Sequence, residues 1–334
     1  MPKIKRLSKN LGFILRVASA NVTGARYPLS VTFISTYRCN FRCEYCDVWT
    51  YKEDELSTSE VKAMIDELAG LGMRRFSFNG GEPLLRADIG ELISYCRQKG
   101  VFTTMFTNGS LLAKNVGKLK DLDILAVSLD GPKEIHERHR LNASFDSAIE
   151  GIKAAKAAGM TVWTNTVITR DTGAHIDALV DIARVLGVRM IFQPVLFYPH
   201  SSDTAEITGL AAQKAEYVRL IERLKELKKA GAPIMHSDEY LDYIKVPVWS
   251  ENKRKCWAGR LYCAITPSGN VAPCYPLFNS KKWPSGRELG YGKAFKSIGR
   301  FGCNGCYCAL VESDFLYSFK PGAVLNLLEA MEAV

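Results

Sequence analysis

The chain has 334 residues, of which 47% are hydrophobic and 24% are charged, and its formal net charge is +9. This composition is ordinary for a soluble globular protein with a core of normal size, so no disulfide framework is needed for stability. Nowhere do about 18 apolar residues run together, which excludes a membrane-spanning helix, and the length suits one large α/β domain with an appendage or two modest domains.

The N-terminal segment, residues 1–28, is basic and has an amphipathic pattern. Residues 1–26 contain six lysines and arginines and no acidic residue. A helix over residues 3–20 would place Leu7, Leu11 and Ile14 on one face, with Lys5 and Lys9 opposite, as in a surface helix. Two interpretations remain open: the helix packs on its own domain, or it contacts a membrane surface and presents a lipid-like substrate.

From residue 31 to about residue 200 the chain alternates β-rich runs with helical patterns. The predicted strands lie within residues 31–36, 74–81, 101–109, 122–131, 160–169 and 188–197. The predicted helices lie within residues 57–72, 89–100, 111–120, 145–159, 175–187 and 211–231, with Ser57 or Ser59 as the N-cap of the first. Strands that each precede a helix predict parallel βαβ units, in a partial barrel or in an open doubly wound sheet, because a closed barrel needs eight such units.

Residues that could bind a ligand or take part in catalysis follow the ends of these strands. Cysteines follow the first strand, Gly80, Gly81 and Glu82 the second, Asn108 the third, and Ser128 and Asp130 the fourth. Active sites of parallel α/β folds lie at the carboxyl ends of the strands. The sequence therefore predicts that these residues meet at one edge of the sheet.

Nine of the ten cysteines fall into two groups. The first group is Cys39, Cys43 and Cys46; the second is Cys256, Cys263, Cys274, Cys303, Cys306 and Cys308. Such close spacings suit metal or iron–sulfur ligation better than disulfides, which favours a cytoplasmic location. Cys96 is predicted to be a buried helix thiol. After residue 235 the regular periodicity fades, so we expect residues 29–235 to form one domain and residues 236–334 a smaller domain organised by metal.

The first cysteine group has the spacing C-x3-C-x2-C directly after a predicted strand. Three thiolates can bind three irons of a [4Fe–4S] cluster and leave the fourth iron open to a small ligand. Tyr45 would present an aromatic face toward that ligand. The alternative is a zinc loop completed by a distant residue.

This loop and its position resemble those of the radical S-adenosylmethionine (SAM) superfamily, over residues 31 to about 200. The resemblance implies a partial (β/α)6 TIM barrel in which SAM is the fourth ligand of the cluster. It also implies reductive cleavage of SAM to a 5′-deoxyadenosyl radical, which abstracts a hydrogen atom from the substrate, with an electron donor such as flavodoxin or ferredoxin.

The same resemblance implies which residues contact SAM. The segment Gly80-Gly81-Glu82-Pro83 is similar to the family's GGEP motif, which lies along the methionyl amino group. The spacing of Ser128 and Arg140 is similar to that in the sulfatase-maturase-like branch, where such residues contact the ribose and the carboxylate, and an arginine fork suits a carboxylate. Asn108 and Val167 are two further candidates for SAM contact, and Val167 would line the adenine pocket. Each also has a purely structural interpretation, because Asn108 lies in an ordinary turn sequence and Val167 would suit the hydrophobic core.

In the second cysteine group, Gly269 precedes Cys274 with the G-x4-C spacing that resembles SPASM and twitch domains, which carry auxiliary [4Fe–4S] clusters. The resemblance implies that Cys256, Cys263 and Cys274 bind one auxiliary cluster, with its fourth ligand among Cys303, Cys306 and Cys308. Since the final group is shorter than in the full SPASM pattern, one auxiliary cluster is predicted. A second, incompletely ligated cluster and a zinc site are the alternatives.

His200, after the sixth strand, and Asp130 are the candidate catalytic acid–base residues. The predicted substrate is a peptide or protein side chain, or a lipid-like small molecule. The alternative to an enzyme is a protein of another functional class: a non-enzymatic, zinc-stabilised, basic protein that binds nucleic acid. No nucleic-acid partner is expected, because the basic residues form no aromatic-interleaved patch outside the N-terminus.

Overall fold

The computed structural model describes residues 3–140, 144–195, 210, 212–245, 254–302, 306, 308 and 310–325, and for residues 3–11 it describes the backbone alone. Two predicted site residues, His200 and Cys303, lie outside this range. The segment 321–334, whose sequence also predicts a terminal helix, lies mostly outside this range.

A parallel sheet with its strands in chain order forms the centre of the molecule. The strands are β1 (Ser30–Ile34), β2 (Arg75–Asn79), β3 (Phe102–Thr107), β4 (Ile124–Ser128), β5 (Val162–Ile168) and β6 (Arg189–Pro194). The main helices that follow them are α2 (Thr58–Gly70), α3 (Ile89–Gln98), α4 (Leu112–Asn115), α6 (Phe145–Ala157), α7 (Thr172–Leu186) and α9 (Lys214–Lys229). The predicted succession of strands and helices is confirmed.

The sheet continues beyond β1 into the C-terminal part of the chain. Strand β7 (Tyr262–Ile265) pairs parallel with β1, and the short β8 (Val271–Ala272) pairs antiparallel with β7. One continuous hydrophobic core contains residues from both sides of position 235, for example Phe33 and Val311. The sheet and the core therefore run across the predicted domain boundary, which itself stays a prediction.

Local sequence signals explain several element boundaries. Ser57 is the N-cap of α2: its side chain accepts from the Glu60 N–H, and the Glu60 side chain accepts in return from the Ser57 N–H, a capping box that satisfies two helix-end donors. The helix predicted within 111–120 is shorter, because the chain passes from α4 into a 3₁₀ turn (Val116–Lys118) that contains Gly117, a poor helix former.

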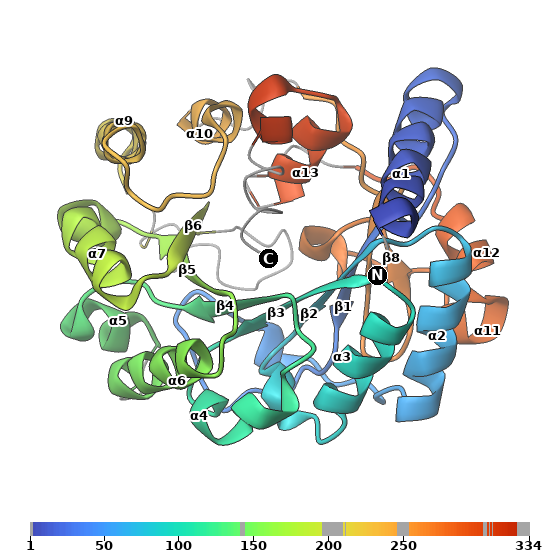
Figure 1. The fold of residues 1–334 in the computed structure, drawn as a ribbon, viewed down its shortest axis with the longest axis horizontal. Coiled ribbons are helices and arrows are strands. Elements are labelled where there is room, and N and C mark those ends of the chain that lie inside the picture. Colours follow the sequence, from blue (N-terminus) through green and yellow to red (C-terminus); the bar gives the residue numbers. More distant parts are fainter. Residues whose placement is uncertain are drawn as a thin grey trace.

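The helix between β4 and α6 escaped the sequence analysis, as did the four helices that the described part of the chain forms after residue 235. Helix α5 (Lys133–Arg140) is strongly polar, yet His136, His139 and Arg140 are buried, so it shows no apolar stripe that would predict it. The remaining helices of the described residues are α1 (Lys3–Thr23), α10 (Asp238–Lys245), α11 (Gly286–Leu289), α12 (Tyr291–Lys296) and α13 (Leu310–Tyr317). Figure 1 shows α2, α3, α4 and α6 along one side of the sheet and α13 on the other.

The C-terminal half of α1 packs on the protein. Val17 and Ala20 are buried, the Phe13 and Tyr317 rings lie 6.0 Å apart, and the Asn21 side chain donates to the Tyr317 carbonyl oxygen at 2.9 Å. Among the helices of the described residues, none has both the length and the apolarity needed to cross a membrane.

Candidate functional site

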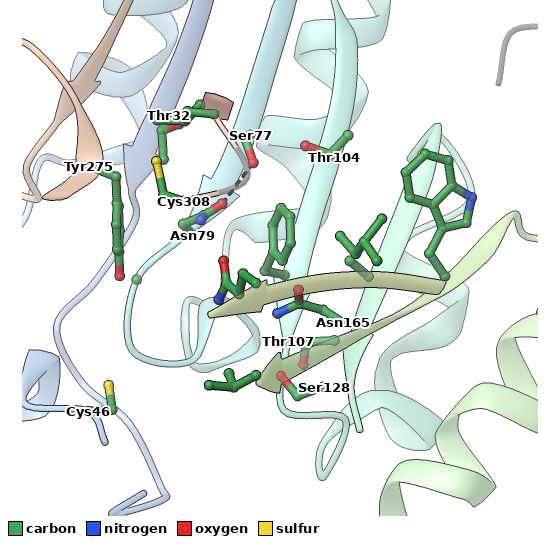
Figure 2. Close-up of a pocket in the computed structure, with 18 of the residues that line it drawn as sticks. Thr32, Cys46, Ser77, Asn79, Thr104, Thr107, Ser128, Asn165, Tyr275 and Cys308 are labelled. Carbon is green, nitrogen blue, oxygen red and sulfur yellow. Dashed lines mark hydrogen bonds between the residues drawn. The ribbon is translucent and has the colours of Figure 1, made fainter. Parts of the chain in front are cut away.

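A cavity of about 410 Å³ lies on the side of the sheet that faces α13. Its lining includes eleven of the predicted site residues: Cys39, Cys43, Tyr45, Cys46, Gly80, Gly81, Asn108, Ser128, Arg140, Val167 and Cys308. Glu82 is not part of the lining. Figure 2 shows Cys46 and Ser128 toward one end of it, where the strands end, and Thr32, Ser77 and Thr104 toward the other. The fold thus brings together residues that are far apart in the sequence.

The first cysteine group lies in the loop between β1 and α2. The Cys46 N–H donates to the Cys43 carbonyl oxygen at 3.0 Å, and the Phe41 N–H donates to the Cys39 sulfur at 3.4 Å. Burial raises the pKa of all three thiols, that of Cys46 to about 12. An electropositive group at this site would favour the thiolate forms, as bound iron does.

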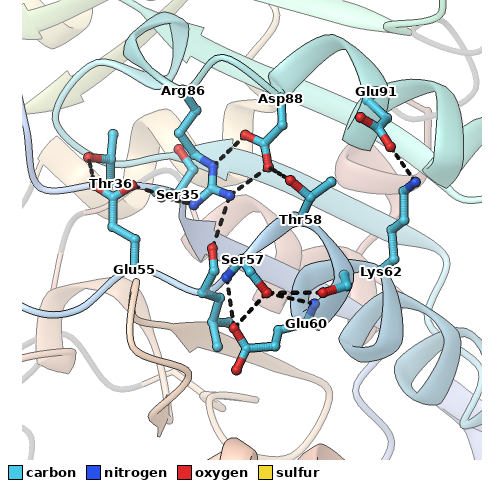
Figure 3. Close-up of polar contacts among 12 residues, drawn as sticks. Ser35, Thr36, Glu55, Ser57, Thr58, Glu60, Lys62, Arg86, Asp88 and Glu91 are labelled. Carbon is cyan, nitrogen blue, oxygen red and sulfur yellow. Dashed lines mark hydrogen bonds and ion pairs between the residues drawn. The ribbon is translucent and has the colours of Figure 1, made fainter.

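Arg86 holds both ends of this loop. Its buried guanidinium donates to the backbone oxygens of Ser35, before the cysteines, and Leu56, after them, at 3.1 Å each. Figure 3 shows this arrangement, in which Arg86 also pairs with Asp88 at 2.7 Å and with Glu55 at 3.6 Å. The sequence analysis missed Arg86, because a single arginine after a turn carries no pattern that reveals its partners.

A second tether joins the loop to α5. The Glu44 carboxylate pairs with Nδ1 of the buried His139, and the Glu44 N–H donates to the His139 carbonyl oxygen at 3.1 Å. On the other side of the ring, His139 Nε2 lies 3.1 Å from the Thr169 hydroxyl. Since Glu44 stands between Cys43 and Tyr45, this tether fixes the centre of the cysteine loop.

Asp130 joins the loop, α5 and β5 through one buried carboxylate. Its Oδ2 accepts from the Tyr45 hydroxyl at 2.5 Å and from Arg140 Nε at 2.9 Å, and its Oδ1 accepts from the Val167 N–H at 3.0 Å. Arg140 Nη1 in turn donates to the Cys43 sulfur at 3.9 Å. Asp130 is fully buried and is absent from the lining of the cavity, so its carboxylate orients neighbours rather than facing a ligand.

Gly80 and Gly81 are required by the close approach of the cysteine loop. A Cβ atom at Gly80 would lie 2.3 Å from the Thr36 carbonyl oxygen, and one at Gly81 would lie 2.2 Å from that of Arg38. Gly80 also has a φ of +138°, which disfavours other residues. The loop and the GGEP segment therefore fit together only if both positions are glycine.

Glu82 and Asn108 connect the ends of β2 and β3. The buried Glu82 carboxylate accepts from the Thr107 hydroxyl at 2.7 Å, the Asn108 N–H at 2.8 Å and the Leu84 N–H at 3.1 Å. Burial is the main cause that raises the pKa of Glu82. The Asn108 side chain donates to Asn40 of the cysteine loop at 2.9 Å, so both residues help to hold the loop.

Four thiols of the second group gather around Tyr262, and Cys263 does not. Burial first, and then the negative charges of Asp314 and of the thiols Cys256, Cys274 and Cys308, raise the pKa of Tyr262. Cys256 Sγ lies 3.6 Å from the Tyr262 hydroxyl, and the sulfurs of Cys306 and Cys308 lie 3.6 Å apart.

Cys263 follows Tyr262 in β7, so its side chain points to the opposite face of the sheet, where it joins the hydrophobic core. Burial alone raises the pKa of Cys263 to about 12. The structure thus separates Cys263 from the cysteines with which the sequence grouped it. Among the described residues, no three His, Cys, Asp or Glu side chains converge closely enough to bind a single metal ion.

The end of the cavity away from the cysteine loop is polar. Strand register aligns Thr32, Ser77 and Thr104 across β1, β2 and β3, and all three line the cavity. On β5, Asn165 is 7% exposed and its Oδ1 has no hydrogen-bond partner among the described residues. These positions escaped the sequence analysis because an inward polar residue in a strand resembles one that faces solvent.

Comparisons with known proteins agree with this geometry. The family model of the Radical SAM superfamily matches residues 33–183. The chain is 31% identical to Fe-coproporphyrin III synthase of Methanosarcina barkeri over 67% of this chain and 60% of that protein. It is 30% identical to mycofactocin maturase MftC of Mycolicibacterium smegmatis over 80% of this chain and 69% of the maturase.

Crystal structures of SuiB from Streptococcus suis have the same fold. SuiB bound to S-adenosylmethionine superimposes with a TM-score of 0.66 at 18% identity, over 85% of this chain and 67% of SuiB. SuiB bound to the precursor peptide SuiA gives a TM-score of 0.65 at 19% identity, over 87% and 72% of the two chains. The sheet is therefore the partial TIM barrel that the sequence predicted. With a cysteine loop after β1, a matching family model and relatives that are named enzymes, the chain is an enzyme of the radical SAM superfamily.

Proposed function

We propose that this enzyme cleaves S-adenosylmethionine reductively at a [4Fe–4S] cluster bound by Cys39, Cys43 and Cys46, and oxidises or cross-links a peptide by hydrogen-atom abstraction. One observation carries the proposal: the three thiols share a single cavity with all the predicted SAM-contact residues except Glu82. When bound, the cluster and SAM supply a 5′-deoxyadenosyl radical. The donor set fits, because three thiols without a fourth protein ligand leave one iron for SAM.

The protein residues bind and orient SAM in this proposal. Asp130 holds Nε of Arg140, so the rest of the guanidinium fork can bind the SAM carboxylate. Ser128 faces the ribose. Val167 packs with Tyr45 in a small apolar cluster that excludes water beside the adenine. Asp130 is a positioning residue here, and the catalytic acid–base role predicted for it has no support in the geometry.

An auxiliary cluster is the second part of the proposal. Cys256, Cys274, Cys306 and Cys308 are the ligands that the geometry around Tyr262 supports, and Cys303 belongs to the same stretch of sequence. Since Cys308 also lines the main cavity, this second centre would lie within reach of the substrate. Flavodoxin or ferredoxin is the proposed electron donor.

A peptide suits the cavity better than an acyl chain. Thr32, Thr104 and Asn165 present hydroxyl and amide groups that an acyl chain would leave unpaired, at a cost of about 1–3 kcal/mol each. A peptide also agrees with SuiB, which binds a precursor peptide. Membrane-surface contact through residues 1–26 stays a prediction. The exposed Ile14 and Leu15 favour it, and it is tested by liposome binding with and without residues 1–26.

The test is anaerobic reconstitution of wild type and of a Cys39/Cys43/Cys46→Ala variant, with iron, sulfide and SAM cleavage measured on both. We expect about eight irons in wild type, about four in the variant, and 5′-deoxyadenosine from wild type alone. The Cys96→Ala variant is the matched control, because that thiol is buried in α3 away from the cavity. Zinc in place of iron, with no SAM cleavage, would refute the proposal.

A further inference from the structure

Arg75 is a cation in the cavity that no described residue neutralises. It is the first residue of β2, it is half-buried, and its side chain lines the cavity. Among the described residues no carboxylate lies within ion-pair distance of its guanidinium, and none accepts a hydrogen bond from it. Three arginines with more deeply buried side chains differ in this respect, because Arg86, Arg140 and Arg254 pair with Asp88, Asp130 and Asp314.

The one carboxylate among the described residues of the lining does not compensate Arg75. Glu312 accepts from the Ser237 N–H at 3.2 Å and lies 3.6 Å from Nδ1 of the buried His236. Its charge is therefore already directed at other groups. A guanidinium that is partly removed from water without a partner is costly, and an anionic ligand would offset that cost.

The groups beside Arg75 can also bind an anion. Ser77 is two residues further along β2, on the same face, and the register places Thr32 and Thr104 on either side of Ser77. All three hydroxyls line the cavity, and Figure 2 shows them close together at the end of the cavity away from the cysteine loop, which we call the inner end. A carboxylate bound by the Arg75 fork could accept further hydrogen bonds from Thr32 and Thr104, whereas the Ser77 hydroxyl already donates to Asn79 Oδ1 at 2.7 Å.

The SAM carboxylate is too far away to be that ligand. Arg75 and Gly80 lie at opposite ends of β2, and five extended residues span roughly 16 Å. SAM has a single carboxylate, and the proposed function assigns it to the Arg140 guanidinium. An anionic ligand at Arg75 would therefore come from the substrate rather than from SAM.

We propose that Arg75, with the hydroxyls of Thr32 and Thr104, forms a subsite that binds a carboxylate of the substrate. The inference rests on the proposed function in that the other end of the cavity holds SAM. The subsite selects substrates whose carboxylate lies at the inner end of the cavity while the reacting hydrogen faces the strand ends. A peptide C-terminus, an acidic side chain or an organic acid would each supply this group.

Equilibrium dialysis of ¹⁴C-labelled ligands against the anaerobically reconstituted full chain tests the subsite. The probes are benzoate and N-acetyl-trialanine with a free carboxylate, and the neutral controls are benzamide and the same peptide as its C-terminal amide. We expect at least one carboxylate to bind wild type about tenfold or more tightly than its neutral analogue. Arg75→Gln should remove this preference, and Arg75→Lys should retain part of it, because lysine keeps the charge but not the fork.

Arg184→Gln is the matched control, since it removes a guanidinium that is exposed on α7 and pairs with Asp181. Equal binding of carboxylates and neutral analogues by wild type would overturn the proposal, and this comparison requires no variant. A preference that survives in Arg75→Gln would overturn it as well. Amidated peptides with an internal glutamate distinguish a side-chain carboxylate from a C-terminal one.

SAM cleavage by wild type is measured separately and reports the proposed function. Carboxylate binding without SAM cleavage would support the subsite and refute the radical chemistry. Cleavage without a carboxylate preference would support the chemistry and refute the subsite.

Discussion

Asp130 and Arg140 form a buried ion pair directly behind the cysteine loop, with 2.9 Å between Asp130 Oδ2 and Arg140 Nε and side-chain exposures of 0% and 7%. Burial is the largest single influence and disfavours the ionised carboxylate, but the charge of Arg140 together with the hydrogen bonds from Tyr45 and Val167 holds the pKa of Asp130 below its usual value. Because Tyr45 donates to the same oxygen, the pair links α5 to the loop that carries the three cysteines.

Asp130→Asn should lower the free energy of unfolding by about 3 kcal/mol, because it leaves the buried Arg140 charge without its counter-ion. Chemical denaturation of the variant and of wild type measures the difference. The matched control is Asp146→Asn, whose partner Lys133 is exposed, and it should change stability by about 0.5 kcal/mol or less. Equal losses in the two variants would contradict a structural role for the buried pair.

His136 makes the stability depend on pH. Its Nδ1 accepts from the Asp130 N–H at 3.2 Å, which requires a neutral ring, and burial together with the charge of Arg140 lowers the pKa of His136 from 6.5 to about 4. As the pH falls below about 6.5, the unfolded chain binds a proton at this residue that the folded chain does not. The free energy of unfolding should therefore fall by up to about 3 kcal/mol between pH 6.5 and pH 4 through this residue alone.

The His136→Asn variant tests this dependence, because the asparagine oxygen can still accept the Asp130 N–H. Urea denaturation from pH 4 to pH 9 should give a shallower slope in the variant below pH 6.5 and parallel curves above about pH 7.5. Parallel curves over the whole range would show that His136 is not the source.

Cys263→Ala should keep the full iron content, whereas Cys274→Ala should lose about four irons per chain. The physical reason is the alternation of side chains in β7, which directs Tyr262 toward the other cysteines and Cys263 into the core. Iron and sulfide determination after anaerobic reconstitution measures the effect, with Cys96→Ala as the control. Loss of iron from Cys263→Ala equal to that from Cys274→Ala would show that Cys263 is a ligand.

Much of the fold follows from local sequence patterns. Hydrophobic periodicity and turn residues predicted six strands with a helix after each, and of the two predicted N-cap serines, Ser57 and Ser59, the structure selects Ser57. These signals are local, so a single sequence contains them in full. The pattern failed at α5, where burial is achieved by paired charges and histidines rather than by apolar residues.

The sequence alone also determined which residues gather at the site, because parallel strands carry their carboxyl ends to one edge of a sheet. The cysteine loop, the glycine pair, Ser128 and Arg140 all line one cavity as that rule requires. Only the tertiary structure decided the partners: Arg86 across the two ends of the loop, Asp130 behind Arg140, and Cys263 on the face opposite Tyr262. Such contacts depend on strand register and on the direction of each side chain, and residue spacing along the chain encodes neither.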